Sequence, residues 1–441
     1  MNRRDALKLG VLGAAAVVTN GVAKQNEEKK TSTAPLTHPV GATARVAIIG
    51  GGYAGLSVAK AIREHNKEAQ IVIFESKNVF ASCPYSNLWI GGVEGATYEE
   101  LLFSPLEPAI TYGYEVVNEK VIAIDRKAKT LTTLGGTYAY TLLVLATGIE
   151  YDYAPFGLDA EEARACRTLF PASYTGGDEQ LTLKKKVENF KEGVFVITVP
   201  KGAYRCPPAP YERAALIASY FQAKGRKAKV VLLDPRDKPT TKSKGFLEAF
   251  AKYEGYLEYV PTSNVTSIDV KNKVVAYDVF DAGTKQFVKQ TLAFDDANII
   301  PSNKASALLT GAGLEVTSTG WGRVVAPGFQ SVSDPDVYIV GDVLGEYPFP
   351  KSAQMANSCG FIAGEQIGRR LSGLDPRVGA QLPANVCYSM VSPTTAIAVT
   401  HQAYLEEKTV KVKTELFEDA NNATAVATKD WYHGITASIF S

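Results

Sequence analysis

Apolar runs of strand length recur along the chain and are separated by polar or glycine-containing segments. The clearest of these runs span residues 45–49, 70–74, 142–145, 193–199, 227–233 and 337–340. They are continuous rather than alternating, which is typical of strands that are buried on both faces of a parallel sheet. Leu56, Ala59 and Ile62 follow the first run at helical spacing. This order of strands and helices predicts an α/β fold with Rossmann-like units.

The first run ends in a glycine-rich turn with the pattern G-x-G-x-x-G, formed by Gly50, Gly52 and Gly55. Gly50 allows a tight turn, Gly52 lets the backbone approach a pyrophosphate, and Gly55 lets the helix and the strand pack closely. Glu75 ends the next strand, at a distance where an acid can bind the ribose hydroxyls of a dinucleotide. Together these features predict a dinucleotide site, and a glycine-rich turn without a ligand is the less favoured alternative.

Two later strands end in residues that suit the same site. One buried strand leads into Thr147 and Gly148, and another leads into Gly341 and Asp342. Ligands of open α/β sheets bind at the carboxyl ends of the strands. With the glycine motif, these residues resemble the disulfide-reductase-like flavoproteins, which have two dinucleotide-binding domains in a glutathione-reductase-like fold. The resemblance implies FAD, with Asp342 on the flavin ribityl chain; a plain surface carboxylate at Asp342 is the alternative.

The runs at 193–199 and 227–233 predict a second Rossmann-like domain, where members of that group usually bind NAD(P)H. The turn between the two runs has no G-x-G-x-x-G motif, and it contains Pro207, Pro208 and Pro210. Proline fixes φ and removes N–H donors, so the anion cradle is lost. We therefore expect nicotinamide cofactors to bind poorly and the electrons to come from another donor. Cys206 lies in this turn, where the nucleotide motif is missing.

Charge and composition exclude several classes of function. The chain has 47 Lys and Arg against 46 Asp and Glu, and the net charge of +1 offers no basic footprint for nucleic acid. Only four His are present, and the five Cys are scattered without a C-x-x-C pair. We therefore expect no metal site.

The first 23 residues have the pattern of an export signal. Arg3 and Arg4 precede a ten-residue apolar or glycine run, which is too short to span a bilayer. The twin arginines favour the twin-arginine route to the periplasm, and a basic amphipathic start of a cytoplasmic protein is the alternative. Residues 24–43 are polar and are expected to form a linker. No later stretch is apolar over 18 residues, so we expect no transmembrane anchor.

Seven further segments carry a closer resemblance, and they are spread over nearly the whole chain after the expected signal. They lie at residues 82–87, 90–92, 205–213, 350–352, 356–358, 387–389 and 431–432. The most specific is Cys-Pro-Pro-x-Pro-Tyr-Glu-Arg, which begins at Cys206. In these segments the chain resembles the flavoprotein subunit of flavocytochrome c sulfide dehydrogenase.

This resemblance assigns roles to three cysteines. It implies that Cys83 holds FAD through an 8α-S thioether, although Pro84 departs from the family pattern; a buried structural thiol is the alternative. It also implies that Cys206 and Cys387 form a redox-active disulfide near the flavin, with an ordinary stabilising disulfide as the alternative. Lys351, in a matching segment, is expected to contact the cofactor.

Other residues of the matching segments are candidates with open alternatives. Glu212 is a candidate general base if burial raises its pKa, but a salt bridge with Arg213 or another cation is nearly as well supported. Trp431 is expected beside the isoalloxazine, or else in the core. Cys166 and Cys359 fall outside the family pattern and are either a second disulfide or buried thiols.

The expected domains follow from these elements. The FAD-binding domain is split into 44–160 and 295–385, the second Rossmann-like domain without a nucleotide fingerprint spans 161–294, and a C-terminal interface domain spans 386–441. The C-terminal domain is expected to contain strands near 395–399 and 410–413. It is the part that suits docking of a partner subunit.

The resemblance implies a periplasmic sulfide dehydrogenase. Hydrosulfide would attack the Cys206–Cys387 disulfide and form a persulfide, and the released thiolate would add to the flavin and pass it two electrons. The acceptor would be a c-type haem on a separate chain, because this sequence has no C-x-x-C-H motif. One alternative is a sulfide:quinone oxidoreductase, which is expected to have an amphipathic C-terminal anchor. The other is a periplasmic partner that keeps a sulfur-carrier protein active.

Overall fold

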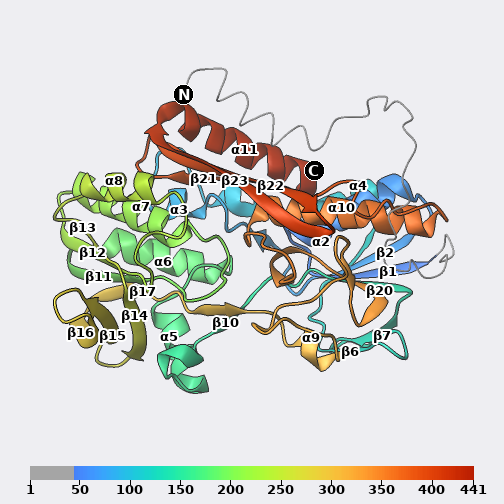
Figure 1. Cartoon of the computed structure of the whole chain (residues 1–441), viewed down its shortest axis with the longest axis horizontal. Helices are drawn as coiled ribbons and strands as arrows, with labels where there is room; N and C mark the ends of the chain where they lie inside the picture. Colours follow the sequence, from blue (N-terminus) through green and yellow to red (C-terminus); the bar gives the residue numbers. More distant parts are fainter. Residues whose placement is uncertain (1–43) are drawn as a thin grey trace.

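The computed structural model describes residues 44–441, so the expected export signal and linker lie outside the described residues. Two sheets, one mainly and one wholly parallel, form two lobes, and a C-terminal sheet and helix run across both (Figure 1). The mixed α/β architecture confirms the expected fold class.

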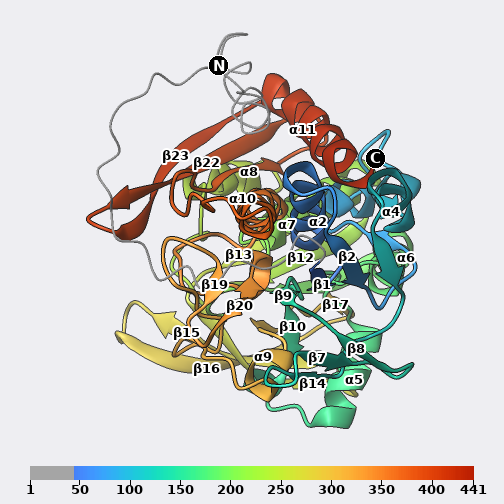
Figure 2. The same cartoon turned by 90° about the vertical axis from the view of Figure 1, so that its right-hand side faces the viewer.

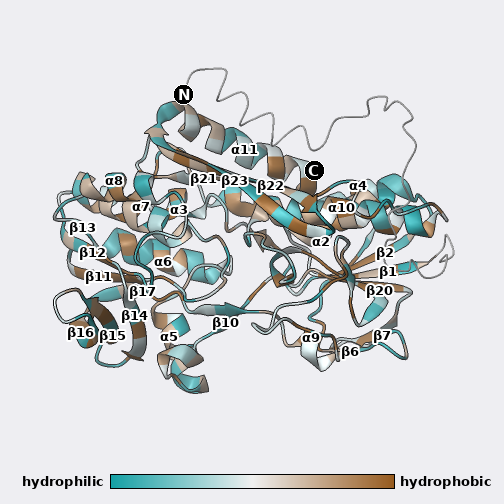
Figure 3. Cartoon of the chain, in the orientation of Figure 1, coloured by the Kyte–Doolittle hydropathy of each residue, from teal (hydrophilic) through white to brown (hydrophobic). Residues whose placement is uncertain are grey.

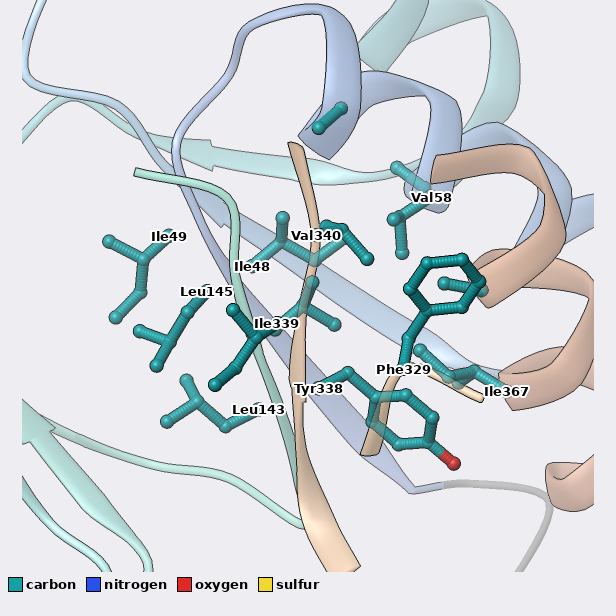
Figure 4. Close-up of a cluster of buried hydrophobic side chains, with 14 of the residues drawn as sticks. Ile48, Ile49, Val58, Leu143, Leu145, Phe329, Tyr338, Ile339, Val340 and Ile367 are labelled. Carbon is teal, nitrogen blue, oxygen red and sulfur yellow. The ribbon is translucent and has the colours of Figure 1, made fainter. Parts of the chain in front are cut away.

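The first lobe contains a six-stranded sheet in the order β19-β20-β9-β1-β2-β5. Its strands are β1 (Arg45–Ile49), β2 (Gln70–Phe74), β5 (Glu115–Val117), β9 (Leu142–Leu145), β19 (Gln330–Ser331) and β20 (Asp334–Ile339). Strands β20, β9, β1, β2 and β5 are parallel to their neighbours, and their apolar side chains are buried as the continuous runs predict. Figure 4 shows Ile48, Leu143 and Ile339 from three adjacent strands of this core, with Phe329 and Ile367 beside them.

Helices α2 (Tyr53–His65) and α10 (Ala353–Leu371) pack closely against one another beside this sheet. Three glycines of α10 at intervals of four residues face α2, and a Cβ atom at Gly360 would lie 2.5 Å from the carbonyl oxygen of Ala54. Only glycines permit this approach of the two backbones. The packing fixes α10 relative to the glycine-rich turn before α2.

The second lobe contains the four-stranded parallel sheet β13-β12-β11-β17. Its strands are β11 (Glu192–Thr198), β12 (Lys227–Leu233), β13 (Leu257–Val260) and β17 (Asp296–Asn298), and its helices are α5 (Ala160–Leu169), α6 (Asp178–Asn189), α7 (Ala209–Ala223) and α8 (Ser243–Ala251). An antiparallel meander of β14 (Ser263–Asp269), β15 (Val274–Asp281) and β16 (Gln286–Ala293) is inserted before β17. The chain leaves the first lobe at β10 (Glu150–Asp152) and returns at β18 (Ser302–Lys304), and these two strands pair.

The expected domain limits need two small corrections. Strand β17 pairs with β11, so the second lobe extends through Asn298 and past the expected limit at 294. Strand β21 (Ala384–Met390) begins before the expected limit at 386. Each expected limit falls inside or just before a strand whose assignment depends on tertiary pairing.

The C-terminal unit is the antiparallel sheet β21-β22-β23 followed by helix α11 (Asn422–Phe440), with β22 at Ala396–Glu406 and β23 at Thr409–Asn421. It contacts α7 and α8 of one lobe and α2 and α10 of the other, and Figure 2 shows α11 above α2. The Asn421 side chain accepts a 2.8 Å hydrogen bond from the backbone N–H of Thr424 and so caps α11. Apolar and polar residues alternate along α11 in Figure 3.

Smaller elements complete the first lobe. They are β3 (Phe80–Ala81), α3 (Ser86–Ile90), β4 (Leu102–Phe103), α4 (Leu106–Tyr112), β6 (Ala123–Asp125), β7 (Thr130–Thr132), β8 (Thr137–Ala139) and α9 (Leu308–Gly311), with short 3-10 turns at Glu99–Leu101 and Gly341–Val343. A further 3-10 turn at Ala154–Phe156 packs against β14 of the second lobe. Helix α3 lies against α6 and α7 of the second lobe. The residues around α3 therefore lie where the two lobes meet.

Candidate active site

The glycine-rich turn has the geometry that the sequence predicts for a dinucleotide site. Gly50 has φ of 109°, which favours glycine. A Cβ atom at Gly55 would lie 1.9 Å from the carbonyl oxygen of Gly50. The backbone N–H of Gly51 donates a 2.8 Å hydrogen bond to the Glu75 carboxylate. Gly52 precedes α2 directly, so the turn ends at a helix N-terminus.

The carboxyl ends of β9 and β20 lie beside this turn, because both strands belong to the same parallel sheet as β1. The buried hydroxyl of Thr147 has no hydrogen-bond partner, and Gly148 and Gly341 have φ of 70° and 76°. Asp342 accepts a 2.6 Å hydrogen bond from Nε of Arg205. The unpartnered Thr147 hydroxyl and the Asp342 carboxylate, beside the glycine-rich turn, fit the ribose and phosphate groups of FAD.

Lys351 is buried next to Asp342 rather than free in the site. Its Nζ donates to the carbonyl oxygens of Asp342 at 2.6 Å and Leu344 at 3.0 Å, and it lies 3.4 Å from the ring centroid of Trp321. Burial lowers the pKa of Lys351 to about 8. The next residue, Ser352, caps α10 by accepting from the backbone N–H of Met355 at 3.1 Å. Lys351 thus fixes the loop that follows β20, and its contact with the cofactor stays a prediction.

A small cavity of about 50 Å³ brings together five of the residues singled out in the sequence: Cys83, Cys206, Glu212, Cys387 and Trp431. They come from the loop before α3, the turn before α7, α7 itself, β21 and α11. Tyr388 also lines this cavity, and its buried hydroxyl has no hydrogen-bond partner among the described residues. We call this space the cysteine cavity.

Cys206 and Cys387 both line the cysteine cavity, and a hydrogen bond between their thiols is the largest influence on the pKa of each. Both are free thiols in this structure. The hydrogen bond from Cys206 lowers the pKa of Cys387 to about 7, and the Lys242 ammonium also lowers it. The same hydrogen bond raises the pKa of Cys206. The negative charge of the pair is therefore favoured on Cys387.

Cys387 also borders a second, more open cavity of about 630 Å³. Its wall contains Pro207, Pro350, His401, Tyr404 and Lys411, among others. Cys206 does not line this outer space, whereas it lines the cysteine cavity. The outer cavity therefore opens on the Cys387 side of the pair.

Cys83 lies in a loop that is held to the dinucleotide turn. The hydroxyls of Tyr53, at the start of α2, and Ser82 are 2.9 Å apart, and the Ser82 carbonyl accepts a 2.8 Å hydrogen bond from Gln180. The hydroxyl of Ser86 donates to the Cys83 carbonyl at 2.6 Å. Burial raises the pKa of the Cys83 thiol. The thiol is thus held near the glycine cradle without being part of the Cys206–Cys387 contact.

Glu212 is buried on the first turn of α7. Its carboxylate accepts a 2.6 Å hydrogen bond from the backbone N–H of Met390 and a 2.7 Å bond from the Asn87 amide. Burial raises its pKa, as the general-base hypothesis requires. Within residues 44–441, Glu212 makes no ion pair, and the Arg213 guanidinium instead binds Asn87, Asn298 and backbone carbonyls.

Trp431 lies partly buried in the wall of the cysteine cavity, and its Nε1 donates a 2.7 Å hydrogen bond to Gln354 of α10. The other two cysteines lie elsewhere. Cys166 is buried on α5 in the second lobe, and Cys359 is buried on α10 in the core of the first lobe. Both are free thiols, so the structure favours buried thiols over a second disulfide.

Sequence reasoning missed three residues of this region. Arg205 contacts Asp342, Asn87 joins Glu212 to Arg213, and Lys242 lies beside Cys387. Arg205 and Asn87 stand inside the matching segments and could have been singled out there. Lys242 lies in a loop with no pattern that would mark it.

The turn before α7 offers few donors to an anion. Pro210 has no N–H, and the N–H groups of Ala209 and Glu212 are bonded to the carbonyl oxygens of Cys206 and Pro208. Tyr204 is fully buried in the same turn, and its hydroxyl donates to the Pro207 carbonyl at 2.7 Å. This geometry supports the expectation of poor nicotinamide binding, which stays a prediction.

Three family models match the chain, in adjoining or separate parts. Residues 44–190 match "Pyridine nucleotide-disulphide oxidoreductase", residues 180–292 match "Sulfide dehydrogenase [flavocytochrome c] flavoprotein chain, central", and residues 380–440 match "Flavocytochrome c sulphide dehydrogenase, flavin-binding". The sulfide dehydrogenase [flavocytochrome c] flavoprotein chain of Chlorobaculum thiosulfatiphilum is 40% identical over 45 residues, which cover 10% of this chain and 94% of that sequence. The chain belongs to the flavocytochrome c sulfide dehydrogenase flavoprotein family. This membership supports FAD as the cofactor.

Two further proteins are similar to this chain, one in structure and one in sequence. The sulfide:quinone oxidoreductase of Aquifex aeolicus has a similar structure, with a TM-score of 0.67 and 19% identity, over 89% of this chain and 90% of that chain. The type II NADH:quinone oxidoreductase of Staphylococcus haemolyticus is 33% identical over 119 residues, or 26% of this chain and 28% of that protein. The chain thus covers under a third of the length of this NADH:quinone oxidoreductase.

Proposed function

We propose that this flavoprotein oxidises sulfide at the Cys206–Cys387 pair and passes the electrons to a c-type cytochrome on a separate chain. The shared cavity of the two thiols carries the proposal, because neighbouring thiols can close a disulfide when two electrons and two protons leave. Cys83 and Glu212 line the same cavity. Family membership makes sulfide the best-supported donor.

The oxidised pair reacts by thiol–disulfide exchange. Hydrosulfide attacks one sulfur of the disulfide, a persulfide forms there, and the other sulfur leaves as a thiolate with the bonding electron pair. A second hydrosulfide then attacks the outer sulfur and releases a hydrogen disulfide, which leaves two cysteine sulfurs in their reduced state. FAD held at the Gly50 turn would supply an acceptor for the electron pair that is released when the cysteine disulfide closes again.

Glu212 moves the protons of this exchange. Its carboxylate is buried in the same cavity as the two thiols, and burial raises its pKa, which makes it a stronger base than an exposed carboxylate. Hydrogen bonds from Asn87 and Met390 hold both carboxylate oxygens in place. Glu212 therefore accepts the proton of incoming hydrogen sulfide, which leaves hydrosulfide as the nucleophile, or the proton of a persulfide on Cys206.

The proposal includes a thioether between Cys83 and the flavin, and export to the periplasm by the twin-arginine route. The fixed loop of Cys83 next to the dinucleotide turn supports the first part. The paired Arg3 and Arg4 support the second, and a covalent cofactor suits a compartment without an FAD pool. The C-terminal unit, which contacts both lobes, is the proposed face for the cytochrome.

A sulfide:quinone oxidoreductase is the rival function, and the fold is similar to one such enzyme. A quinone enzyme needs an apolar surface that enters the membrane. On α11, Val426 is the one large apolar side chain that is well exposed, while Ile435, Ile439 and Phe440 are buried. Within residues 44–441, no helix has both the length and the apolarity to cross a bilayer. A partner that keeps a sulfur-carrier protein active is the third candidate.

Rapid mixing with sulfide under anaerobic conditions tests the proposed chemistry. Cys206→Ser and Cys387→Ser should each abolish fast bleaching of the flavin band by sulfide while FAD stays bound. Cys166→Ala, which lies outside the cysteine cavity, should bleach like the wild type. Peptide mapping of the oxidised protein should link Cys206 to Cys387. Normal turnover by both serine variants would disprove the mechanism.

Steady-state assays then separate the three functions. The proposed function predicts that sulfide reduces cytochrome c faster than a soluble quinone in the presence of the protein. Faster reduction of quinone would favour the first rival. Negligible turnover with both acceptors, together with reactivation of an oxidised sulfur-carrier protein, would favour the second.

A further inference from the structure

Lys242 is a fully buried lysine just before α8, and it reaches the strand that carries Cys387. Its Nζ donates hydrogen bonds to the Cys387 carbonyl oxygen at 3.1 Å and to the Ser389 hydroxyl at 2.8 Å. Its side chain has no exposed surface. The proposed reaction does not involve this group directly.

The ammonium has no carboxylate to pair with. Among the described residues, no Asp or Glu lies within ion-pair distance of Lys242 Nζ. Burial lowers the pKa of Lys242, and the acidic groups that oppose this effect are Cys387 first, then Glu212 and Cys206, with Glu418 of β23 last. A buried charge is costly unless an opposite charge or hydrogen bonds compensate it. A thiolate on Cys387 supplies the negative charge that compensates the buried Lys242 ammonium.

The neighbouring basic group does not compete for the thiolate. His401 of β22 lies on the same side, and burial followed by the Lys242 charge lowers its pKa to about 4. Its Nδ1 lies 2.9 Å from the Asn385 amide nitrogen. His401 is therefore neutral near pH 7, and Lys242 is the cation that faces Cys387.

The backbone holds Lys242 and Cys206 in an uncommon conformation. Lys242 has φ of 53° and Cys206 has φ of 51°, both in the left-handed region that side chains rarely adopt. Such residues persist where the surrounding structure fixes them, and they concentrate at functional sites. Here one of the two positions carries a thiol of the pair, and the other carries the lysine that binds the Cys387 carbonyl.

We infer that Lys242 is a positioning residue that holds the negative charge of the reduced thiol pair on Cys387 and makes Cys387 the leaving sulfur. The inference rests on the proposed function for its role in turnover. Hydrosulfide attacks Cys206 Sγ, the Cys206–Cys387 bond breaks, and its electron pair stays on Cys387 as a thiolate beside the ammonium. The product is a Cys206 persulfide that keeps the hydrogen of hydrosulfide, so atoms and charge balance.

The charge on Cys387 can be measured without sulfide turnover. The reduced holoprotein is alkylated briefly with iodoacetamide from pH 5 to pH 10, and the modified peptides are quantified by mass spectrometry. The pH midpoint is compared rather than the rate, because the outer cavity exposes Cys387 more than Cys206. In the wild type, Cys387 should titrate with a midpoint near 7 and below that of Cys206.

Variants assign the effect to the charge of Lys242. Lys242→Met should raise the Cys387 midpoint by about one pH unit or more, since a nearby cation is what lowers a thiol pKa. Lys242→Arg keeps the charge and should keep a low midpoint. Lys244→Met is the matched control, because Lys244 is exposed, binds Asp419 at 3.0 Å and should leave the midpoint unchanged. If Lys242→Met does not fold, the comparison of Lys242→Gln with Lys242→Arg serves instead.

Three results would overturn the inference: an ordinary midpoint for Cys387 in the wild type, an unchanged midpoint in the uncharged variants, or a persulfide mapped to Cys387 after one equivalent of sulfide. A low, Lys242-dependent midpoint in a protein that sulfide does not reduce would instead disprove the proposed function and leave the electrostatic assignment standing. The two failures are therefore distinguishable.

Discussion

Nδ2 of Asn87 donates a 2.7 Å hydrogen bond to Glu212, while Oδ1 of the same amide accepts a 2.8 Å bond from Nε of Arg213. One amide thus separates a buried carboxylate from a buried guanidinium that follows it directly in α7. The arrangement keeps Arg213 from neutralising Glu212 as a direct ion pair. Desolvation then dominates, and it raises the pKa of Glu212.

This relationship predicts a pH-dependent effect of Glu212→Gln. A carboxylate acts as a base only when it is deprotonated, so its contribution is lost as the pH falls through its raised pKa. We expect the variant to slow flavin reduction by sulfide about a hundredfold at neutral and alkaline pH. The ratio of wild-type to variant rates should fall toward one in acid.

The ratio is the quantity to measure, because protonation of hydrosulfide affects both proteins equally. Glu188→Gln is a suitable control, since Glu188 is exposed and pairs only with Lys184 among the described residues. A ratio that stays constant with pH would show that Glu212 positions the site rather than moving protons.

A covalent flavin at Cys83 predicts where the yellow colour goes after acid precipitation. Wild-type protein should retain the flavin in the pellet, and Cys83→Ser should release it to the supernatant, because the thioether would need this sulfur. Cys166→Ala should retain the colour, since Cys166 is buried on α5 away from the cysteine cavity. Free FAD released from the wild type would contradict the assignment.

The turn before α7 predicts that NADH and NADPH do not reduce the flavin. Pro210 lacks an N–H, and the N–H of Ala209 is already bonded to the Cys206 carbonyl, so a pyrophosphate finds few donors. Stopped-flow mixing with stoichiometric NADH should leave the flavin band unchanged from milliseconds to seconds. Sulfide in the same buffer is the positive control, and bleaching by NADH would refute the interpretation.

The dinucleotide turn could be predicted from sequence because local geometry dictates it: Gly55 must lack a Cβ atom whatever surrounds it. The contact between Cys206 and Cys387 followed only from the family resemblance, since spacing says nothing about which distant segments meet. The sequence does not predict helix α11, because its Thr, Asn and Gly residues are poor helix formers and burial against α2, α4 and the C-terminal sheet stabilises it. Lys242 could not be found, since its burial depends on a strand that follows much later in the chain.

Gly55→Ala should prevent FAD binding, whereas Gly434→Ala should not. An added methyl at Gly55 would lie 1.9 Å from the Gly50 carbonyl oxygen, and a backbone atom of a tight turn cannot move away cheaply. We expect a loss of about 2 kcal/mol or more in the free energy of unfolding and a colourless protein. At Gly434, in α11, a methyl meets nothing within 4 Å, so alanine should stabilise the helix by about 0.5–1 kcal/mol. Chemical denaturation and the flavin absorbance of the purified variants measure both effects. A Gly55→Ala protein with full flavin content would mean that the turn has a different path from the one in this structure.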